Sequence, residues 1–243
     1  MEKYYIASVS FGKDSLAMLL LILEKNLPLN EVIFFDTGME FDAIYKNCDK
    51  VALLLQEKGI KFTVGGLKMP FEDYMYNYPH QSRKGENKAG YGWCGGLCRW
   101  ATTFKTMFID NYVKKLVDYE VVQYVGIAID EPERLNRLKE SELTKVSPLA
   151  TYNMTEADAL EYCYKNGYNW IEEGVELYDI LDRVSCWCCR NKNLKELRNY
   201  KRYLPNKYKA LQELEEKIGE PMKKPIYLKD RFKYDQMTIF DYL

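Results

Sequence analysis

The start of the chain alternates between short apolar runs and longer segments with helical character. Residues 4–10, 31–36 and 61–64 have the composition of buried strands. Residues 15–26 and 41–58 have helical patterns, the first apolar nearly all round and the second with an apolar stripe. Because strands that alternate with helices form parallel sheets covered on both faces, the sequence predicts an α/β fold.

The remainder of the chain is less regular. Residues 66–96 are rich in Gly, Tyr, Asn and Lys and show no clear period, so we predict a long loop of the kind that is functional or mobile. Further along, the sequence predicts a helix at 99–117, a strand at 121–129, a helix that opens at Thr155, an irregular cysteine-bearing region at 171–192, and two helices and a tail from Leu194.

Bulk composition argues against several classes of protein. Lys and Arg (35) nearly balance Asp and Glu (36), so nucleic-acid or membrane binding would need a local basic patch. The sequence has no apolar run long enough for a membrane span and no signal-peptide core, which predicts a soluble cytoplasmic protein. With His80 as the only histidine, a histidine-based metal site or a Ser/His triad is poorly supported.

The segment between the first predicted strand and helix reads SVSFGKDS. In a parallel sheet such a turn directs backbone N–H groups and the positive helix N-terminus into the crevice at the strand ends. Gly12 lets the backbone approach a phosphate, Lys13 adds a charge, and Ser10 and Ser15 add hydroxyls. The cluster predicts a nucleotide-phosphate site, and the alternative is an ordinary strand–helix turn. The spacing is not that of a Walker A loop.

Motifs along the chain resemble those of one protein family. SFGKDS resembles the S-x-G-x-D-S signature of the PP-loop ATP pyrophosphatases, which are related to the adenine nucleotide alpha hydrolases. DTGME, which begins at Asp36, resembles the D-T-G-x-E of the phosphoadenosine phosphosulfate (PAPS) reductase family. Residues 126–134 resemble that family's G-x-R-x-x-E-S region, from which Ala128 and Pro132 depart.

The resemblance continues through Ser147-Pro148-Leu149, the helix that follows, a loop tyrosine at Tyr178 and the later cysteines. It covers residues 4–192, and several motifs in order are more specific than any single one. The fold that it implies is a Rossmann-like (HUP-type) parallel five-stranded sheet with helices on both faces, followed by a cysteine-rich irregular region and C-terminal helices.

The resemblance also implies a site for ATP and Mg²⁺. The implied catalytic residues are Lys13, Asp14 and Arg134, and the implied nucleotide-binding residues are Ser10, Gly12, Lys13, Asp14, Ser15, Asp36, Thr37, Gly38, Gly126 and Glu131. Arg134 would contact a phosphate or sulfate oxyanion, and Asp36 would have a ribose-linked or Mg²⁺-linked role. From the residues alone, Asp36 could instead cap the edge of the core, and Glu131 and Arg134 could begin a solvated helix.

Five of the seven cysteines fall in two irregular segments. An odd number of cysteines in such a chain favours metal, cluster or catalytic use over a disulfide framework. Four of them could surround a [4Fe–4S] cluster or a Zn²⁺ ion, with Cys188 competing for one place: Cys94, Cys98, Cys186 and Cys189. The resemblance favours the cluster, since cluster-bearing members have cysteines at these positions. Free thiols are the alternative.

The function that the resemblance implies is adenylylation of an acceptor by ATP, with release of pyrophosphate, followed by sulfur transfer supported by the cysteine-bound cluster. The related tRNA thiolases and DNA phosphorothioation proteins make nucleic acid, DNA in particular, the preferred acceptor and a sulfur-donor protein an expected partner. One alternative is a sulfonucleotide reductase acting on PAPS or adenylyl sulfate. The intact SFGKDS and the lack of any cysteine after Cys189 count against it. Another alternative is a non-enzymatic nucleotide-binding module with structural zinc.

Three regions are predicted: a nucleotide-binding domain at 1–192, a helical extension at 193–234 and a tail at 235–243. The tail contains QMTIF, Gln236–Phe240, which resembles the peptide by which bacterial proteins dock on the DNA sliding clamp; the alternative is a tail folded onto its own core. Basic and aromatic residues precede it and could follow phosphates, stack bases or form a solvated surface: Lys223, Lys224, Tyr227, Lys229, Arg231, Phe232, Lys233 and Tyr234.

Overall fold

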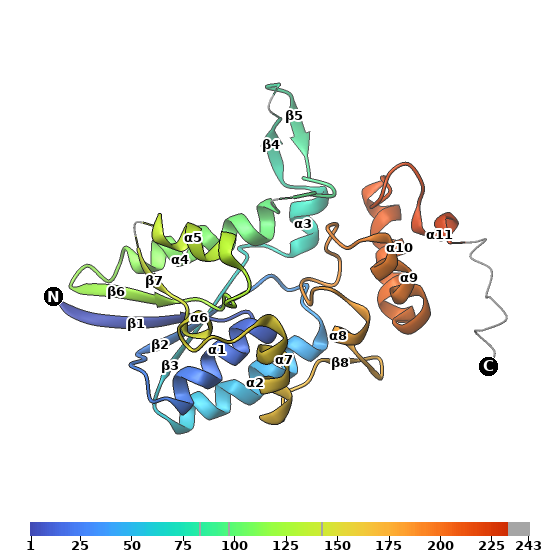
Figure 1. Cartoon of the computed structure of the whole chain (residues 1–243). Coiled ribbons are helices and arrows are strands. Elements are labelled where there is room, and N and C mark those ends of the chain that lie inside the picture. Colours follow the sequence, from blue (N-terminus) through green and yellow to red (C-terminus); the bar gives the residue numbers. More distant parts are fainter. Residues whose placement is uncertain (83, 97, 142, 233–243) are drawn as a thin grey trace, which may run out of the picture.

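The computed structural model describes residues 1–82, 84–96, 98–141 and 143–232. Figure 1 shows a sheet between layers of helices, a hairpin that projects from this body, and the C-terminal helices beside it. The elements, in chain order, are β1 (Glu2–Ser8), α1 (Lys13–Glu24), β2 (Glu31–Asp36), α2 (Asp42–Glu57), β3 (Lys61–Gly66), α3 (Phe71–Tyr76), β4 (Pro79–Gln81), β5 (Asn87–Ala89), the π-helical turn η1 (Arg99–Thr103), α4 (Phe104–Val113), β6 (Tyr119–Tyr124), α5 (Pro132–Lys139), β7 (Thr144–Val146), α6 (Pro148–Thr151), α7 (Glu156–Lys165), β8 (Ile171–Glu172), β9 (Val175–Glu176), α8 (Leu177–Ile180), α9 (Leu194–Tyr203), α10 (Pro205–Ile218) and α11 (Leu228–Arg231).

The five-stranded sheet is parallel throughout, and its strand order is β3-β2-β1-β6-β7. The chain runs outward from β1 through β2 to β3 and then crosses to the other side of β1 with β6 and β7. The turn after β1 therefore lies where the strand order reverses, which is the position of the ligand crevice in open parallel sheets. The predicted α/β fold with five parallel strands is confirmed, and SFGKDS lies at this turn.

Alternate residues of β1 face opposite sides of the sheet. Ala7 belongs to the larger apolar core with α1, whereas Ile6 packs with Ile33 and Val121 beneath side chains of α4. Helix α1 is buried along most of its length, because it lies between the sheet and helices α6 and α7 (Figure 1). Because α1 is covered on two sides, its sequence is apolar nearly all round.

The prediction of an irregular loop at 66–96 is wrong in part. This segment contains α3 and the hairpin β4–β5, in which Pro79 pairs with Ala89 and His80 with Lys88. Strands of three residues are too short to show a period, and a projecting hairpin buries no apolar face that would impose one.

Other predicted elements differ at their ends. The helix expected at 99–117 begins with η1 and ends at Val113. Strand β6 ends at Tyr124 rather than at 129, because the chain turns there and brings Gly126 against the loop after β1. In the part of the chain that the structure describes, no helix combines the length and the apolar character needed to cross a membrane.

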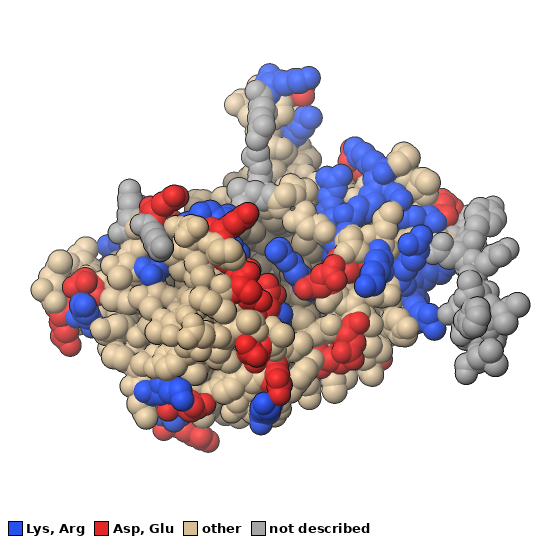
Figure 2. Space-filling view, in the orientation of Figure 1, with Lys and Arg blue, Asp and Glu red and all other residues tan. Residues whose placement is uncertain are grey.

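The C-terminal helices are tied to the rest of the chain. The Trp93 indole donates to the carbonyl oxygen of Glu220 at 2.9 Å, and Arg190 Nε donates to that of Met222 at 2.9 Å. Figure 2 shows Lys and Arg side chains gathered over these helices. The predicted tail, including Gln236–Phe240, lies outside the described residues.

Candidate active site

The loop after β1 has a constrained backbone. Phe11 has a positive φ of 58°, a left-handed conformation that is uncommon for residues with a side chain. Its buried ring packs edge-on against Phe34 with centroids 5.0 Å apart, and its carbonyl oxygen accepts from the Trp170 indole at 2.7 Å. These contacts stabilise a sharp turn, so that α1 begins soon after β1 ends.

The two serines shape the same loop. Ser15 Oγ donates to the carbonyl oxygen of Gly12 at 3.1 Å and accepts from the backbone N–H of Ser10 at 3.1 Å. The two hydroxyl oxygens are also 3.1 Å apart. Ser10 is exposed, so its hydroxyl remains accessible to a ligand.

The amine of Lys13 lies between two carboxylates. Its Nζ donates to Asp14 Oδ1 at 2.7 Å and to Oε2 of Glu156, in the first turn of α7, at 2.6 Å. Burial lowers the pKa of Lys13, but its hydrogen bonds to Asp14 and Glu156 outweigh this effect and raise the pKa above its ordinary value of 10.5. Burial raises the pKa of Asp14 above its ordinary 3.8, against the opposing effect of Lys13. Lys13 is therefore a fully charged cation at neutral pH.

Tyr178 caps the start of α1. Its phenol oxygen accepts from the backbone N–H of Lys13 at 2.8 Å and would lie 3.4 Å from a Cβ placed at Gly12. Burial raises the pKa of Tyr178, so the phenol keeps its proton. The first amides of a helix are the groups that bind phosphate oxygens in nucleotide-binding loops, so the phenol marks a place where an anion can bind.

Gly126, just after β6, supports this loop by close contact. A Cβ at Gly126 would lie 2.8 Å from the carbonyl carbon and oxygen of Asp14 and from Ser15 Cα. Backbone atoms cannot move aside as the end of a side chain can, so only glycine permits this approach.

Asp36 ends the neighbouring strand β2. Its Oδ1 accepts from the backbone N–H of Gly38 and from the hydroxyl of Tyr45, both at 2.7 Å. This is the capping role that the sequence left open as an alternative. The bonds use one carboxylate oxygen, so they are compatible with a second role at the other oxygen.

Thr37 and Glu40, in the turn after β2, contact the cysteine region. Thr37 Oγ1 donates to Glu40 Oε1 at 3.0 Å, and Cys186 Sγ lies 3.4 Å from Thr37 Oγ1 and 3.5 Å from Glu40 Oε1. Burial raises the pKa of Glu40 and raises the pKa of Cys186 well above its ordinary value. The DTGME turn thus connects the predicted nucleotide site with the cysteines.

Two residues directly after the second cysteine segment join it to the first. Arg190 Nη1 donates to the carbonyl oxygen of Trp93 at 3.2 Å. The side-chain amide of Asn191 makes two hydrogen bonds with the backbone of Gly96, each 3.0 Å long. These contacts hold the two cysteine segments side by side.

None of the seven cysteines, all of which lie within the described residues, forms a disulfide. Cys188 is buried, and burial, together with the neighbouring Cys189, Glu40 and Cys98, raises its pKa well above the ordinary value. Among the described residues, no three His, Cys, Asp or Glu side chains are arranged to hold a metal ion.

Two amines lie in electrostatic range of these thiols. Burial lowers the pKa of Lys105, an effect opposed by Glu40 and Cys186. Burial also lowers the pKa of Lys192, and Cys189 is among the groups that oppose it.

Glu131 and Arg134 begin helix α5. Glu131 pairs with Arg134 and accepts from the backbone N–H of Ala128 at 3.3 Å. Glu131 also lies close enough to Asp14 to contribute to the raised pKa of that carboxyl. The pair thus lies at the rim of the site, and the contact of Arg134 with an oxyanion stays a prediction.

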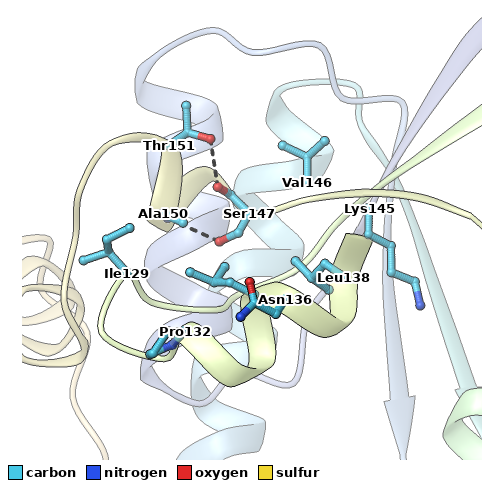
Figure 3. A pocket seen from close by; sticks show the side chains of 10 residues that line it. Ile129, Pro132, Asn136, Leu138, Lys145, Val146, Ser147, Ala150 and Thr151 are labelled. Atoms are coloured by element: carbon cyan, nitrogen blue, oxygen red, sulfur yellow. Dashed lines mark hydrogen bonds between the residues drawn. The ribbon is translucent and has the colours of Figure 1, made fainter. Parts of the chain in front are cut away.

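A separate cavity of about 500 Å³ lies between α5, β7 and α6 (Figure 3). Its lining is mainly apolar and includes Ile129, Pro132, Leu138 and Val146, with Ser147 beside them. None of the predicted nucleotide-site residues lines this cavity, so it does not mark the nucleotide position.

The sequence reading missed three residues that shape the site. In the sequence, Glu156 is visible only as an acid in the first turn of the helix that Thr155 opens. In the structure it lies at the start of α7 and accepts a hydrogen bond from Lys13. Tyr178 was noted as a loop tyrosine but not as the cap of α1, and Asn191 carried no signal at all. Glu40 is part of the DTGME motif, and that motif is the sequence signal that could have indicated its contacts with Thr37 and Cys186.

Comparison with known proteins agrees with this architecture. The family model of the phosphoadenosine phosphosulfate reductase domain matches residues 4–189. An uncharacterized protein of Methanocaldococcus jannaschii, MJ0066, is 26% identical over 212 residues, which cover 84% of this chain and 40% of that protein. This chain therefore spans less than half the length of that relative.

Two solved structures are similar at lower levels. The U34-tRNA thiolase NcsA from Methanococcus maripaludis, solved with its [4Fe-4S] cluster, is 16% identical with a TM-score of 0.44, covering 90% of this chain and 73% of that one. A predicted subunit of tRNA methyltransferase from Methanocaldococcus jannaschii is 17% identical with a TM-score of 0.32, covering 86% of this chain and 92% of that one. Similarity at these levels adds nothing about activity.

Proposed function

This chain belongs to the phosphoadenosine phosphosulfate reductase domain family, within the PP-loop superfamily, and from that premise we propose that it is an ATP-dependent adenylyl-transfer and sulfur-transfer enzyme. ATP and Mg²⁺ would bind at residues 10–15. An acceptor oxygen attacks the α-phosphorus, the new O–P bond forms as the bond to pyrophosphate breaks, and pyrophosphate leaves. A sulfur nucleophile at the oxidation level of sulfide then displaces AMP from the acceptor, so the sequence of steps needs no oxidant or reductant.

The observation that carries this proposal is the position of Lys13 at the N-terminus of α1. Its ammonium and the free amides of the helix would stabilise the negative charge that develops on the phosphates during attack. In the structure, this ammonium donates hydrogen bonds to Asp14 and Glu156. Mg²⁺ prefers carboxylate and phosphate oxygens, so its arrival with ATP would draw Asp14 away and free Lys13 for the phosphates.

Further roles follow from position. We assign the ribose or a Mg²⁺-bound water to the second carboxylate oxygen of Asp36, with Thr37 and Gly38 lining the same turn. Arg134 would exchange its partner Glu131 for a phosphate oxygen when nucleotide is present.

The cysteine region fits a metal centre by its donor chemistry. Cysteine thiolates are the ligands of [4Fe–4S] clusters and of structural Zn²⁺. The two segments are held side by side. The residues that would hold it are Cys94, Cys98, Cys186 and Cys189, with Cys188 competing for one place. A bound cluster would supply a site for sulfide.

Nucleic acid, DNA in particular, is the proposed acceptor. Residues 193–231 contain 11 Lys and Arg against 6 Asp and Glu, although the whole chain has a net charge of -1. Such a local excess of positive charge matches a polyanion. A sulfur donor would be a further partner, and docking of Gln236–Phe240 on a sliding clamp stays a prediction.

The test of this proposal is pyrophosphate release from ATP in the presence of DNA and RNA acceptors. Lys13→Ala should lower the rate at least about 100-fold, the effect of removing one preorganised charge-stabilising group. Lys25→Ala is the matched control, since Lys25 lies just after the same helix and pairs with Glu24. Absence of pyrophosphate release with every acceptor would favour a nucleotide-binding regulatory module, and PAPS reduction would favour a sulfonucleotide reductase.

Metal content separates the cysteine hypotheses. Anaerobically purified protein should contain about four irons and four sulfides per chain if a [4Fe–4S] cluster is bound. Cys94→Ser and Cys189→Ser should lose them, whereas Cys48→Ser should not, because Cys48 lies on α2. One zinc without iron would make the centre structural and would contradict a sulfide-holding cluster.

A further inference from the structure

Positive charge in this chain is concentrated after the cysteine region. Residues 1–192 contain 23 Lys and Arg against 28 Asp and Glu, whereas residues 193–231 contain 11 against 6. In Figure 2 the resulting basic area covers the C-terminal helices, while acidic and basic side chains are mixed over the sheet domain.

The basic segment that the sequence singled out is largely occupied with its own fold. Lys223 Nζ donates to the carbonyl oxygen of Arg190 at 2.5 Å, Lys224 pairs with Glu220 at 3.1 Å, and Lys229 pairs with Glu216 at 3.4 Å. Phe232 is only 2% exposed, so it cannot stack on a base without unfolding. This segment is an anchor of the C-terminal helices rather than an open binding surface.

Helix α9 is different, because its charges are sorted by face. Its buried face consists of Glu196, Leu197 and Tyr200. Every exposed charged side chain of the helix is a cation, and these are Lys195, Arg198, Lys201 and Arg202. Lys201 Nζ also donates to the carbonyl oxygen of Phe232 at 2.6 Å, and Arg198 lies over the Phe232 ring. The one acidic residue of α9 is therefore turned inward, where its carboxylate closes the capping box with Asn193.

The cations of α9 have the spacing of a backbone-binding stripe. Lys195, Arg198 and Arg202 recur at intervals of three and four, which places them along one side of the helix. At a rise of 1.5 Å per residue they span about 10 Å, which is roughly three phosphates of one strand at 3.4 Å per nucleotide. Arginine also binds phosphate oxygens in a bidentate manner.

Helix α9 is also fixed relative to the nucleotide site. Glu196 Oε1 accepts from the backbone N–H of Asp182 at 3.2 Å, and the side-chain amide of Asn199 donates to the carbonyl oxygen of Ile180 at 2.7 Å. Ile180 ends α8, the same short helix that carries Tyr178 to the N–H of Lys13. The buried side of α9 thus faces α8, and its exposed cations lie on the opposite side of the helix.

We propose that the exposed face of α9 binds the phosphate backbone of the nucleic-acid acceptor. The acceptor class rests on the proposed function. Because the contacts are to phosphates, this binding is independent of base sequence and decreases steeply with salt.

The test measures binding of fluorescein-labelled oligonucleotides of one sequence, as single-stranded DNA, duplex DNA and RNA, by fluorescence anisotropy over a range of salt concentrations. The variant Lys195→Gln/Arg198→Gln/Arg202→Gln should bind about tenfold more weakly or worse at low salt. The slope of log affinity against log salt should fall by about two to three, since each lost phosphate contact removes about 0.7–0.9.

A matched control removes three exposed lysines that precede the amino ends of β3 and β6: Lys58→Gln/Lys114→Gln/Lys115→Gln. It should keep the wild-type affinity and slope. Arg198→Lys/Arg202→Lys, which keeps the charge, should retain most of the slope, and thermal melts with and without ATP check that each variant is folded.

An unchanged slope in the α9 variant, or an equal loss in the control, would overturn the proposal. Failure of the proposed function has a different signature. If α9-dependent binding is seen without pyrophosphate release, the surface stands and the activity fails. If pyrophosphate is released with a small acceptor while no nucleic acid binds, the surface fails and the adenylylation stands.

Discussion

The phenol of Tyr178 and the backbone N–H of Lys13 are 165 residues apart in sequence and are joined by a hydrogen bond of 2.8 Å. The bond places a neutral acceptor on the helix amide that a phosphate oxygen would otherwise bind. It also links α8, and through α8 the helix α9, to the phosphate loop. Under the proposed function, a phosphate oxygen of ATP would take the place of the phenol at this amide.

Replacing this phenol separates its structural role from nucleotide binding. Tyr178→Phe leaves the N–H of Lys13 without its partner and should lower the free energy of unfolding by about 1–3 kcal/mol when no nucleotide is present. With ATP and Mg²⁺ the deficit should shrink, because a phosphate oxygen takes the place of the phenol. Chemical denaturation with and without ATP measures both values.

Tyr162→Phe is the control for this experiment, since it removes a tyrosine bond to Glu24 outside the site. Its effect should be the same with and without ATP. If Tyr178→Phe instead abolished stabilisation by ATP, the phenol would be part of the nucleotide site rather than a substitute for the nucleotide.

A methyl group at Gly126 should disturb the phosphate loop directly. Its Cβ would lie 2.8 Å from backbone atoms of Asp14, so Gly126→Ala should lower the free energy of unfolding by about 1–3 kcal/mol and weaken ATP binding. In Gly66→Ala the nearest atom would be the carbonyl oxygen of Asp36 at 3.5 Å, an ordinary contact, and both quantities should stay near wild type. Equal effects of the two substitutions would argue against a supporting role for Gly126. Calorimetry with ATP and thermal denaturation provide the measurements.

The contact between Asn191 and Gly96 should matter for metal content. Asn191→Ala removes two hydrogen bonds that hold the cysteine segments together but leaves every thiol in place. Metal affinity should fall about 10–100-fold, as it does when other supporting groups around metal ligands are removed. Metal analysis after chelator competition is the readout, with a thiol count to confirm that all cysteines remain. Asn166→Ala, which removes a bond to the carbonyl oxygen of Tyr162 at the end of α7, should not change it. Wild-type affinity in Asn191→Ala would show that the cysteine segments need no such support.

The pH dependence of stability should reveal the partly buried carboxyl of Asp14. Its pKa is raised above 3.8, so the folded chain binds this proton more tightly than the unfolded chain does. The resulting stabilisation is fully present below 3.8 and is lost as the pH rises through the raised pKa of the folded state. Relative to Asp14→Asn, the wild type should therefore lose stability as the pH increases across that window. Urea denaturation at a series of pH values measures the difference.

Asp158 offers a comparison of opposite sign. Hydrogen bonds from the side chain and backbone of Thr155 lower the pKa of Asp158 below 3.8. Its contribution is present above 3.8 and is lost as the pH falls through the lowered pKa, so the wild type should lose stability relative to Asp158→Asn on acidification. The same sign for both carboxyls would contradict this description of the site.

Local sequence was enough to predict the layers of the fold and the position of SFGKDS in the turn after β1. Burial on one or both faces sets the spacing of apolar residues in β1, β2, β3 and the helices between them. This spacing is visible among neighbouring residues, so it can be read from local sequence. Gly12, Lys13 and the two serines lie within six residues of one another, so their joint role is visible in a single motif.

Only the tertiary structure decided which partners complete the site. Glu156 reaches Lys13 across 143 positions, and Asn191 reaches Gly96 across 95. A charge or an amide has the same appearance in a sequence whether it is solvated or paired, because its partner is chosen by the packing of separate elements. For the same reason, the sequence does not indicate that Lys223 donates a hydrogen bond to the backbone of Arg190. Nor does it define the exposed face of α9, which depends on the burial of Glu196 and Tyr200.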